Sequence, residues 1–432
     1  MNVYFESLGC RLNQSELESL IFRFAAAGHT AVGDPAQADV CVVNTCAVTA
    51  EAERKSRHRV RALARINSHV RIAAIGCLAT MDPQQCAALP GVAWIVPNAD
   101  KERLLEIVTS SPLSPCARPS RSGHQDEVCP GGTGWVDDGL LHTRAFVKAQ
   151  DGCDNHCTYC VIRRLRGPSR SRPLADVVAS VQSLVKAGYQ EAVLTGVNLG
   201  AYGRDLALPG GLRTLVAALL SDTDMPRLRL SSLEPWDLDE AFFRLWESPR
   251  LCRQLHLPLQ AGCDATLRRM GRRTTTAEFA RLVRSARAAV PDLAVTTDVI
   301  VGFPGEDETA FRASYEFVAV MGFARLHVFR YSPRPGTAAV HLPGQVSHET
   351  TRSRARAMGE LGSRHAARFR QRFVGQEMAV LWEHCRRDSL WAGLTDNYLQ
   401  VVTRAGEDLR NRLTATRLCA VQDDHLVGEV IG

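Results

Sequence analysis

The chain has 432 residues, of which 45% are hydrophobic and 23% charged, and a formal net charge of +6 at pH 7. This composition is ordinary for a globular protein and excludes disordered and collagen-like chains. Charges interrupt the apolar runs before about 18 residues, so no membrane-spanning helix is predicted. The first residues carry Glu6 and lack the basic start of a signal peptide. We therefore expect a cytoplasmic protein of about three domains, without a membrane partner; its charge is compatible with nucleic acid binding but does not establish it.

Short apolar runs alternate with helical patterns in the first part of the chain. The runs cover residues 2–8, 38–45 and 70–76, and the helical stretches cover 15–27 and 51–66. Continuous apolar runs of this length are typical of buried parallel strands. The alternation predicts an α/β domain over 1–108, with a parallel sheet covered on both faces. Ser, Pro and Gly are frequent over 109–141, which predicts a linker.

A second α/β region follows over 142–372. Helical patterns, for example at 174–187 and 275–289, separate six strand candidates, which are 144–149, 191–195, 227–232, 254–259, 294–301 and 324–331. Six repeated βα units predict an open or partial barrel whose ligands lie at the carboxyl ends of the strands. A basic helix is expected over 350–372. The last segment, 373–432, predicts a small all-β barrel with strands at 377–383, 391–394, 398–403 and 425–431.

Three cysteines stand close together after the first strand of this second region. Cys153, Cys157 and Cys160 have the spacing C-x3-C-x2-C. A 4Fe–4S cluster normally takes four cysteines, so three leave one iron open to bind a small molecule. The alternative is a zinc site completed by His156. Zinc sites usually show a C-x2-C pair with a second such pair further along the chain, and no second pair follows here.

Three further cysteines follow the three predicted strands of the first domain. Cys10, Cys46 and Cys77 each stand at the carboxyl end of one strand, whereas Cys41 lies inside a strand. Since the carboxyl ends of parallel strands meet at one edge of a sheet, the first three can converge on one crevice. Their thiolates again suit a 4Fe–4S cluster with an open iron.

These segments resemble a known family. The C-x3-C-x2-C spacing with Tyr159 before the third cysteine is similar to the radical S-adenosylmethionine signature. SLGCRLNQSELES, VVNTCAVTAEAERKSR and AIGCLA resemble the N-terminal domain of the methylthiotransferases. RAFVKAQDGCDNHCTYC, LTGVNLGAYG, HLPLQAGC, DVIVGFPGE and FRYSPRPGTAA resemble their partial (β/α)6 radical domain, and the last segment resembles their TRAM domain.

The resemblance implies two 4Fe–4S clusters and S-adenosylmethionine as cofactors. Cys153, Cys157 and Cys160 would be catalytic, holding the cluster that splits S-adenosylmethionine, and Cys10, Cys46 and Cys77 would hold the cluster that carries sulfur. A flavodoxin- or ferredoxin-type protein would supply electrons. The residues that the resemblance places against S-adenosylmethionine follow the barrel strands and are Thr195, Gly196, Asn198, Glu234, Gln260, Asp298 and Gly302.

Three substrates are known for the family: tRNA adenosine with a threonylcarbamoyl group, tRNA adenosine with an isopentenyl group, and an aspartate of a ribosomal protein. Asn13 and Gln14 resemble the tRNA-acting types, and Glu53–Arg57 resembles the threonylcarbamoyl type. We therefore expect methylthiolation of carbon 2 of N6-threonylcarbamoyladenosine at position 37 of tRNA, with the anticodon stem-loop as partner. The tail from Phe373, with nine Asp and Glu against six Arg, keeps the ribosomal protein open as an alternative. A non-catalytic zinc protein that binds nucleic acid is the alternative from another class.

Overall fold

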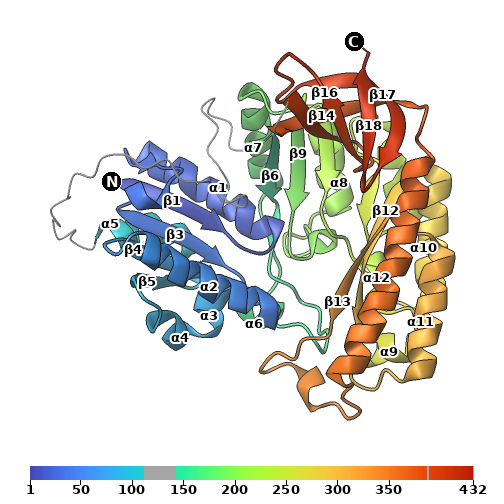
Figure 1. The fold of residues 1–432 in the computed structure, drawn as a ribbon, viewed down its shortest axis with the longest axis horizontal. Coiled ribbons are helices and arrows are strands. Elements are labelled where there is room, and N and C mark those ends of the chain that lie inside the picture. Colours follow the sequence, from blue (N-terminus) through green and yellow to red (C-terminus); the bar gives the residue numbers. More distant parts are fainter. Residues whose placement is uncertain (111–142, 387–388, 432) are drawn as a thin grey trace. The chain divides into compact units, whose positions relative to one another are not determined.

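The computed structural model describes residues 1–110, 143–386 and 389–431 (Figure 1). Two compact units are formed: the described residues up to Ser110 together with Arg164–Gly167, and the remaining described residues. The second unit contains both the barrel strands and the C-terminal β-barrel. The expected boundaries at 108, 142 and 373 stay predictions, and nearly all of the expected linker lies outside the described residues.

The first unit is built on a parallel sheet with the strand order β2-β1-β3-β4-β5. Its strands are β1 (Asn2–Ser7), β2 (Thr30–Ala31), β3 (Val40–Thr45), β4 (Arg71–Gly76) and β5 (Val92–Val96). Its helices are α1 (Arg11–Ala26), η1 (Pro35–Gln37), α2 (Ala50–Ile66), α3 (Cys77–Met81), α4 (Pro83–Ala87), η2 (Asn98–Arg103) and α5 (Leu104–Thr109). The three predicted strands and two predicted helices are confirmed, and β2, β5 and the short helices are additions.

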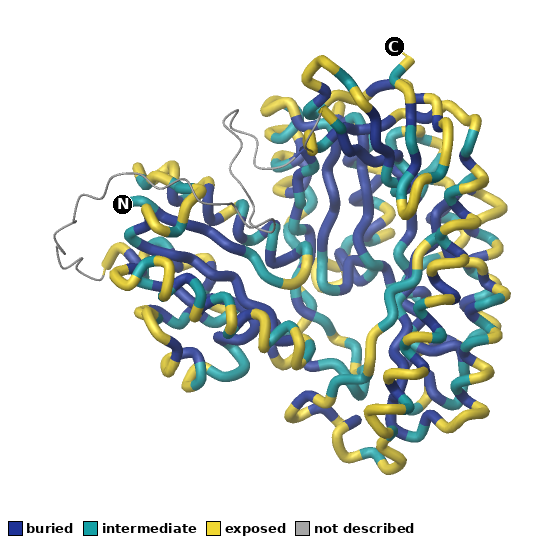
Figure 2. The backbone as a smooth tube through the Cα atoms, in the orientation of Figure 1, coloured by how far each residue is buried: buried dark blue, intermediate teal, exposed yellow. Residues whose placement is uncertain are grey.

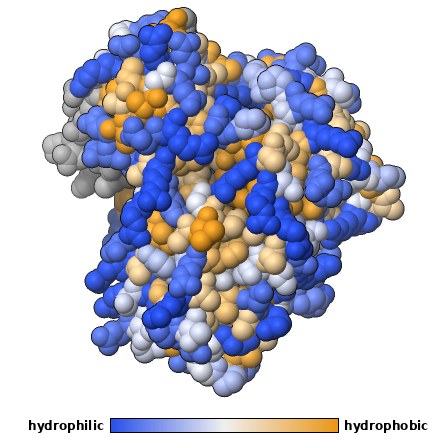
Figure 3. All heavy atoms as spheres, turned by 90° about the vertical axis from the view of Figure 1, so that its right-hand side faces the viewer, coloured by the Kyte–Doolittle hydropathy of each residue, from blue (hydrophilic) through white to orange (hydrophobic). Residues whose placement is uncertain are grey.

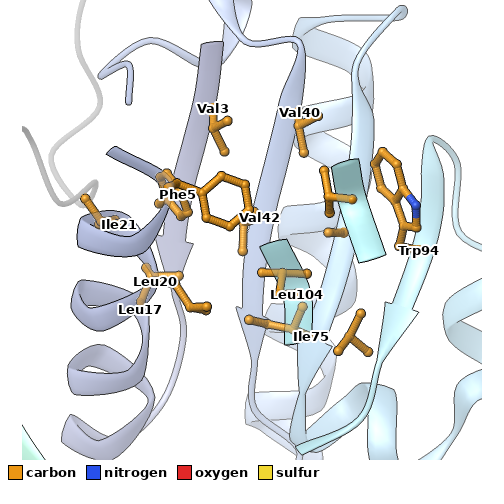
Figure 4. Packing of buried hydrophobic residues seen from close by; sticks show 14 residues of the cluster. Val3, Phe5, Leu17, Leu20, Ile21, Val40, Val42, Ile75, Trp94 and Leu104 are labelled. Carbon is orange, nitrogen blue, oxygen red and sulfur yellow. The ribbon is translucent and has the colours of Figure 1, made fainter. Parts of the chain in front are cut away.

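Both faces of this sheet are covered, as expected for a buried parallel sheet. Val40 and Val42 of β3 pack with α1 and α5 on one face (Figure 4). The alternate residues Cys41 and Val43 pack with α2 on the other face, around Leu63. Full burial of each large apolar side chain stabilises the unit by about 1.5–3 kcal/mol. The strands are accordingly buried along most of their length (Figure 2).

The second unit begins with six parallel strands, which confirm the predicted open barrel. They form two sheets, with the orders β10-β9-β6 and β11-β12-β13, joined by isolated parallel bridges at Leu228–Leu251 and Ser232–His256. The strands are β6 (Arg144–Lys148), β9 (Glu191–Thr195), β10 (Arg227–Leu230), β11 (Gln254–His256), β12 (Ala294–Val301) and β13 (Arg325–Arg330); β7 (Gln150–Asp151) pairs with β8 (Arg170–Ser171).

Helices and short 3-10 helices (η) lie between the strands of this region along the chain, and the end of α6 belongs to the first unit. They are α6 (Ile162–Arg166), α7 (Leu174–Lys186), η3 (Leu199–Ala201), α8 (Leu212–Asp222), η4 (Pro235–Asp237), η5 (Glu240–Glu247), α9 (Asp264–Arg269), α10 (Thr276–Ala289), α11 (Glu308–Met321), η6 (Ala338–His341) and α12 (His348–Gln371). The predicted helices in α7, α10 and α12 are confirmed. Figure 3 shows the face that carries α10, α11 and α12, where hydrophilic side chains predominate. No helix in the described part of the chain is long and apolar enough to span a membrane.

The C-terminal segment forms the predicted closed barrel, with the strand order β14-β15-β16-β18-β17. Its strands are β14 (Glu377–Arg386), β15 (Leu390–Thr395), β16 (Gln400–Arg404), β17 (Leu413–Gln422) and β18 (His425–Val430). Strand β17 was not predicted, because two of its inward residues are Thr414 and Thr416 rather than apolar. The hydroxyl of Thr414 accepts a hydrogen bond of 2.8 Å from the indole of Trp382, so the interior of the barrel is partly polar.

Buried arginines join this small barrel to the preceding strands. Arg229 on β10 is fully buried, and its Nε lies 2.6 Å from Glu191 Oε1 on β9. The same guanidinium donates to the carbonyl oxygen of Asp396, after β15, over 2.8 Å. The ion pair with Glu191 therefore compensates the charge of the buried guanidinium, which also donates a hydrogen bond to the barrel.

Candidate functional site

Cys10, Cys46 and Cys77 stand at the carboxyl ends of three neighbouring strands in the first unit. Cys10 caps α1 after β1, Cys46 follows β3, and Cys77 begins α3 directly after β4. Since β1, β3 and β4 are adjacent and parallel, the three residues lie at one edge of the sheet. The structure thus brings them together as the sequence predicted.

The backbone around these cysteines is closely packed. Gly9 has φ +101°, and a Cβ at this position would lie 2.6 Å from Cys46 Cβ, so only glycine fits. Ser56 of α2 makes two hydrogen bonds to the backbone of Cys46: its hydroxyl accepts from the Cys46 N–H over 3.0 Å and donates to the Cys46 carbonyl over 2.9 Å. At Cys77, the side-chain amide nitrogen of Asn98 lies 3.6 Å from Sγ.

The thiol of Cys46 is hard to ionise in the protein alone. Burial raises the pKa of Cys46 to about 11; charges at Cys77 and Cys10 raise it further, and the cation of Arg166 opposes them. A bound metal deprotonates coordinating thiols outright. Three thiols at one edge of the sheet, two of them buried, therefore form a donor set that fits an iron–sulfur cluster.

A buried ionic network lies beside Cys10. The guanidinium of Arg166 bonds to Glu16 Oε1 at 2.8 Å and to Asn13 Oδ1 at 2.7 Å, and its side chain is only 1% exposed. Lys101 also contacts Glu16, at 2.5 Å. Asn13 in turn donates to the carbonyls of Leu8 and Thr45, which precede two of the cysteines.

The arginines that follow Cys160 differ in exposure. Arg163, Arg164 and Arg170 are exposed, whereas Arg166 is buried. Its partner Glu16 is 150 residues away in sequence, and no local signal indicates that pairing.

Cys153, Cys157 and Cys160 lie in the loop that follows β7, close to the end of β6 in the second unit. The loop is held by backbone contacts: Thr158 N–H donates to the Met270 carbonyl over 2.9 Å, and its hydroxyl donates to the Arg269 carbonyl over 2.8 Å. Gly271, at φ +70°, allows close approach, because a Cβ there would lie 2.9 Å from the His156 carbonyl oxygen.

The environment of these thiols parallels that of the first unit. Burial raises the pKa of Cys153 to about 11 and that of Cys160 to about 12. The neighbouring thiols add to both shifts, which shows that the three groups interact electrostatically. A donor set of three such thiols again fits an iron–sulfur cluster.

His156 does not complete a compact zinc site. Its ring lies 2.9 Å from the guanidinium of Arg163 and is exposed. Among the described residues, one set of His, Cys, Asp or Glu brings three ligand atoms within 4.8 Å of one another, and it contains no cysteine. In neither cysteine set do the three sulfurs all lie within 4.8 Å of one another.

Arg272 is a cation beside the Cys153–Cys160 loop that the sequence did not reveal. Its Nη1 lies 3.9 Å from Cys157 Sγ, and the same guanidinium binds both carboxylate oxygens of Glu234 at 3.0 and 2.6 Å. It also donates to the Pro258 carbonyl over 2.6 Å and lies 4.5 Å from the ring centroid of Trp236. Glu234, expected to contact S-adenosylmethionine, forms an ion pair with Arg272 in this structure.

Replacing Arg272 by Met should destabilise the second unit by roughly 3 kcal/mol, because Glu234 would lose its buried partner. Arg273, the next residue, is exposed, so Arg273→Met is the matched control and should change stability little. Urea unfolding curves of the two variants, recorded side by side, measure the difference. Equal midpoints would show that the pair contributes nothing to folding.

The residues after β9 form a second support of the Cys153–Cys160 loop. Thr195 ends β9, and its carbonyl accepts from the Ala149 N–H at 2.9 Å. The side chain of Gln150 accepts from the Asn198 N–H over 2.8 Å and donates to the carbonyl oxygens of residues 151 and 152. A Cβ on Gly196 would lie 2.9 Å from Gln150 Oε1, so this glycine permits the contact. Gln150 carries no recognisable sequence signal.

One atom in this region points to a ligand. The Oδ1 of Asn198 is buried and has no hydrogen-bond partner among the described residues. A buried acceptor without a partner costs about 1–3 kcal/mol. A donor such as the amino group of S-adenosylmethionine would satisfy it, so this position fits the expected cofactor.

The other expected cofactor contacts are distributed over the following strands. Gln260 adopts φ +72°, and its N–H donates to the Asp298 carbonyl over 2.8 Å. The Asp298 carboxylate lies 3.3 Å from the His256 ring. Gly302 has φ +75°, and a Cβ at this position would collide with the side chain of Thr351. The glycine thus permits packing of α12, and the contact with S-adenosylmethionine expected there stays a prediction.

Comparisons with known proteins agree with this architecture. Residues 2–96 match the uncharacterized protein family UPF0004, and residues 147–318 match the radical SAM superfamily. The chain is 34% identical to the threonylcarbamoyladenosine tRNA methylthiotransferase MtaB of Thermotoga maritima, covering 94% of this chain and 92% of the relative. It is 36% identical to the ribosomal protein uS12 methylthiotransferase RimO of Desulfosudis oleivorans, covering 91% and 90%.

The fold has a solved counterpart. The radical S-adenosylmethionine methyltransferase TsrM of Kitasatospora setae, solved with cobalamin and a [4Fe-4S] cluster, aligns with a TM-score of 0.55 and 16% identity over 77% of this chain and 73% of that chain. Other relatives are named tRNA-2-methylthio-N(6)-dimethylallyladenosine synthase. Enzymes of this family use 4Fe–4S clusters and S-adenosylmethionine, so the non-catalytic zinc alternative is set aside. The chain belongs to the radical S-adenosylmethionine methylthiotransferases.

Proposed function

We propose that this enzyme converts N6-threonylcarbamoyladenosine at position 37 of tRNA into 2-methylthio-N6-threonylcarbamoyladenosine. The observation that carries the proposal is the pair of cysteine sets: one at three adjacent strand ends in the first unit, and one in the loop after β7 in the second. Family members named for this nucleoside match nearly the whole chain at 34% identity, which supports the choice of substrate.

The two cysteine sets take different roles in this proposal. Cys153, Cys157 and Cys160 would hold the cluster whose open iron binds S-adenosylmethionine, with Asn198 as acceptor for its amino group. Cys10, Cys46 and Cys77 would hold the sulfur-carrying cluster. When bound, the clusters and S-adenosylmethionine supply the electron, the radical that removes the hydrogen at carbon 2, the sulfur and the methyl group. The protein contributes the six thiols, glycines that allow close packing, and fixed cations.

The block Glu53–Arg57 holds part of the cysteine site in the first unit. Arg57 is paired with Glu53 and donates to Gln85 over 2.6 Å, and Ser56 holds the backbone of Cys46. The residues that resemble the threonylcarbamoyl type therefore fix one cysteine of the proposed sulfur-carrying site. Exposed basic residues on the same helix, among them Arg54 and Arg61, remain available to phosphates of the anticodon stem-loop.

Substrate choice is tested by competition among three acceptors. Carbon 2 is the same in both modified adenosines, so discrimination depends on the group at N6, where a threonylcarbamoyl group carries a carboxylate and an isopentenyl group is apolar. A site with a cation for the carboxylate rejects the apolar group, because a buried unpaired charge costs several kcal/mol. We expect methylthiolation of the threonylcarbamoyl tRNA and at most a trace with the isopentenyl tRNA.

The assay offers the anaerobically reconstituted enzyme either tRNA, or ribosomal protein uS12, with a flavodoxin- or ferredoxin-type reductant. Nucleosides and peptides are then analysed by mass spectrometry. The mildly acidic C-terminal barrel and the 36% identical relative named for uS12 make the ribosomal protein the second candidate. Turnover of uS12 alone, or of the isopentenyl tRNA alone, would overturn the substrate while leaving the family chemistry in place.

A further inference from the structure

Three metal-ligating side chains outside the cysteine sets meet on one face of the second sheet. His256 ends β11, Asp298 lies within β12 and His327 lies within β13. These strands are neighbours, and the register pairs Asp298 directly with His327. Side chains on one face of a sheet recur at every second residue, so residues paired directly across two strands lie on the same face. The topology therefore places both imidazoles and the carboxylate together.

The ligand atoms of this group lie within the range of a single ion. One atom each of His256, Asp298 and His327 lies within 4.8 Å of the others, and all three residues are half-buried. His256 Nε2 is 3.3 Å from Asp298 Oδ1. The two imidazole rings have centroids 5.8 Å apart and planes inclined by 72°, so they are not stacked face to face.

A second contact fixes the orientation of one ring. His256 Nδ1 lies 2.9 Å from the hydroxyl of Thr296, two residues before Asp298 on β12. Ligating histidines almost always bond through their other ring nitrogen to a polar partner, which holds the ring in place. Thr296 has this position, and Nε2 of His256 is the atom that faces Asp298.

We propose that His256, Asp298 and His327 bind one divalent transition-metal ion. Two imidazoles and one carboxylate are a facial ligand set for Fe(II), and imidazole also suits zinc and copper. Three protein ligands leave further coordination positions to water or to an oxygen of a bound molecule. The proposal is independent of the iron–sulfur clusters, whose cysteines lie elsewhere in the chain, and it gives Asp298 a role other than contact with S-adenosylmethionine.

Binding of Mn(II) to the reconstituted enzyme tests the site. Carboxylate, carbonyl and water oxygens suit manganese, whereas thiolates select softer metals, so exposed cysteines such as Cys385 and Cys419 do not compete for it. The six-line electron paramagnetic resonance signal of free Mn(II) should decrease until about one ion is bound per chain. Zinc should displace that ion, because zinc stands above manganese in the affinity order.

Two variants and a control make the assignment specific. His327→Ala and Asp298→Asn should each weaken Mn(II) binding by at least about tenfold, since each loses one ligand. His384→Ala removes an exposed imidazole on β14 and should leave binding unchanged. Circular dichroism and iron content confirm folding of every sample, and two independent variants keep the test valid where one of them does not fold.

The outcomes separate the possibilities. Binding near one ion per chain that both variants weaken supports the site. Absence of bound Mn(II) in the wild-type enzyme, or equal binding by the wild type and His327→Ala, overturns it. Loss of S-adenosylmethionine cleavage in Asp298→Asn together with unchanged Mn(II) binding in both variants would also overturn it, and would return Asp298 to the cofactor. The substrate assay above is a separate measurement, so failure of one proposal does not affect the other.

Discussion

Replacing Cys153, Cys157 and Cys160 together with Ala is expected to abolish cleavage of S-adenosylmethionine and to leave about half of the bound iron. These thiols are proposed to hold the cluster that binds S-adenosylmethionine and passes the electron to it. The other cysteine set belongs to a different compact unit and should keep its own iron. The measurements are 5′-deoxyadenosine release by liquid chromatography and iron per chain after anaerobic reconstitution.

A matched triple variant controls for the loss of three thiols. Cys263, Cys385 and Cys419 lie outside both sets, in the same unit as the targeted loop. Their combined replacement with Ala should leave iron content and 5′-deoxyadenosine release unchanged. Continued release of 5′-deoxyadenosine by the Cys153, Cys157 and Cys160 variant would refute the assignment of this loop.

Cys46→Ala is expected to abolish the methylthiolated product while 5′-deoxyadenosine is still formed. In the proposed mechanism, formation of 5′-deoxyadenosine needs only the cluster at the Cys153–Cys160 loop, so it should persist. Methylthiolated nucleoside should fall below detection, because one of the three thiols at the proposed sulfur-carrying site is lost. Both products are measured in the same reaction by mass spectrometry.

Cys41→Ala is the control, since Cys41 lies five residues earlier on β3 in the hydrophobic core. Burial raises the pKa of its thiol to about 12, and it packs on the face of the sheet that α2 covers. This variant should lose stability modestly and keep methylthiolation. Full methylthiolation by Cys46→Ala would remove the basis for a second cluster at the strand ends.

The strand ends that carry the cysteines could be predicted from sequence for a simple physical reason. A parallel strand buried on both faces is a continuous apolar run, and β1, β3 and β4 are such runs. Once their order along the chain is known, the residue after each run is placed at the same sheet edge. The six strands of the open barrel were found in the same way.

Two strands could not be predicted from the apolar pattern. Strand β17 points Thr414 and Thr416 inward, so its pattern does not alternate between apolar and polar residues. The short strand β2 pairs through two residues only, which is too little sequence for a pattern.

The ionic supports of the site could not be predicted either. Arg166 and Arg272 each stand beside exposed arginines, and composition alone assigns such a segment to solvent. Their burial depends on Glu16 and Glu234, which come from distant parts of the chain. Pairing between distant charges has no periodicity in sequence, so only the fold reveals it.

Mass spectrometry of tRNA nucleosides from a strain that lacks this gene tests the central proposal most directly. The strain is complemented with the wild-type chain, with Cys46→Ala or with Cys41→Ala. We expect 2-methylthio-N6-threonylcarbamoyladenosine to be absent from the deletion strain and from the Cys46→Ala strain, with N6-threonylcarbamoyladenosine in its place, and to be restored by the wild-type and Cys41→Ala chains. An unchanged level of the methylthiolated nucleoside in the deletion strain would contradict the proposed function.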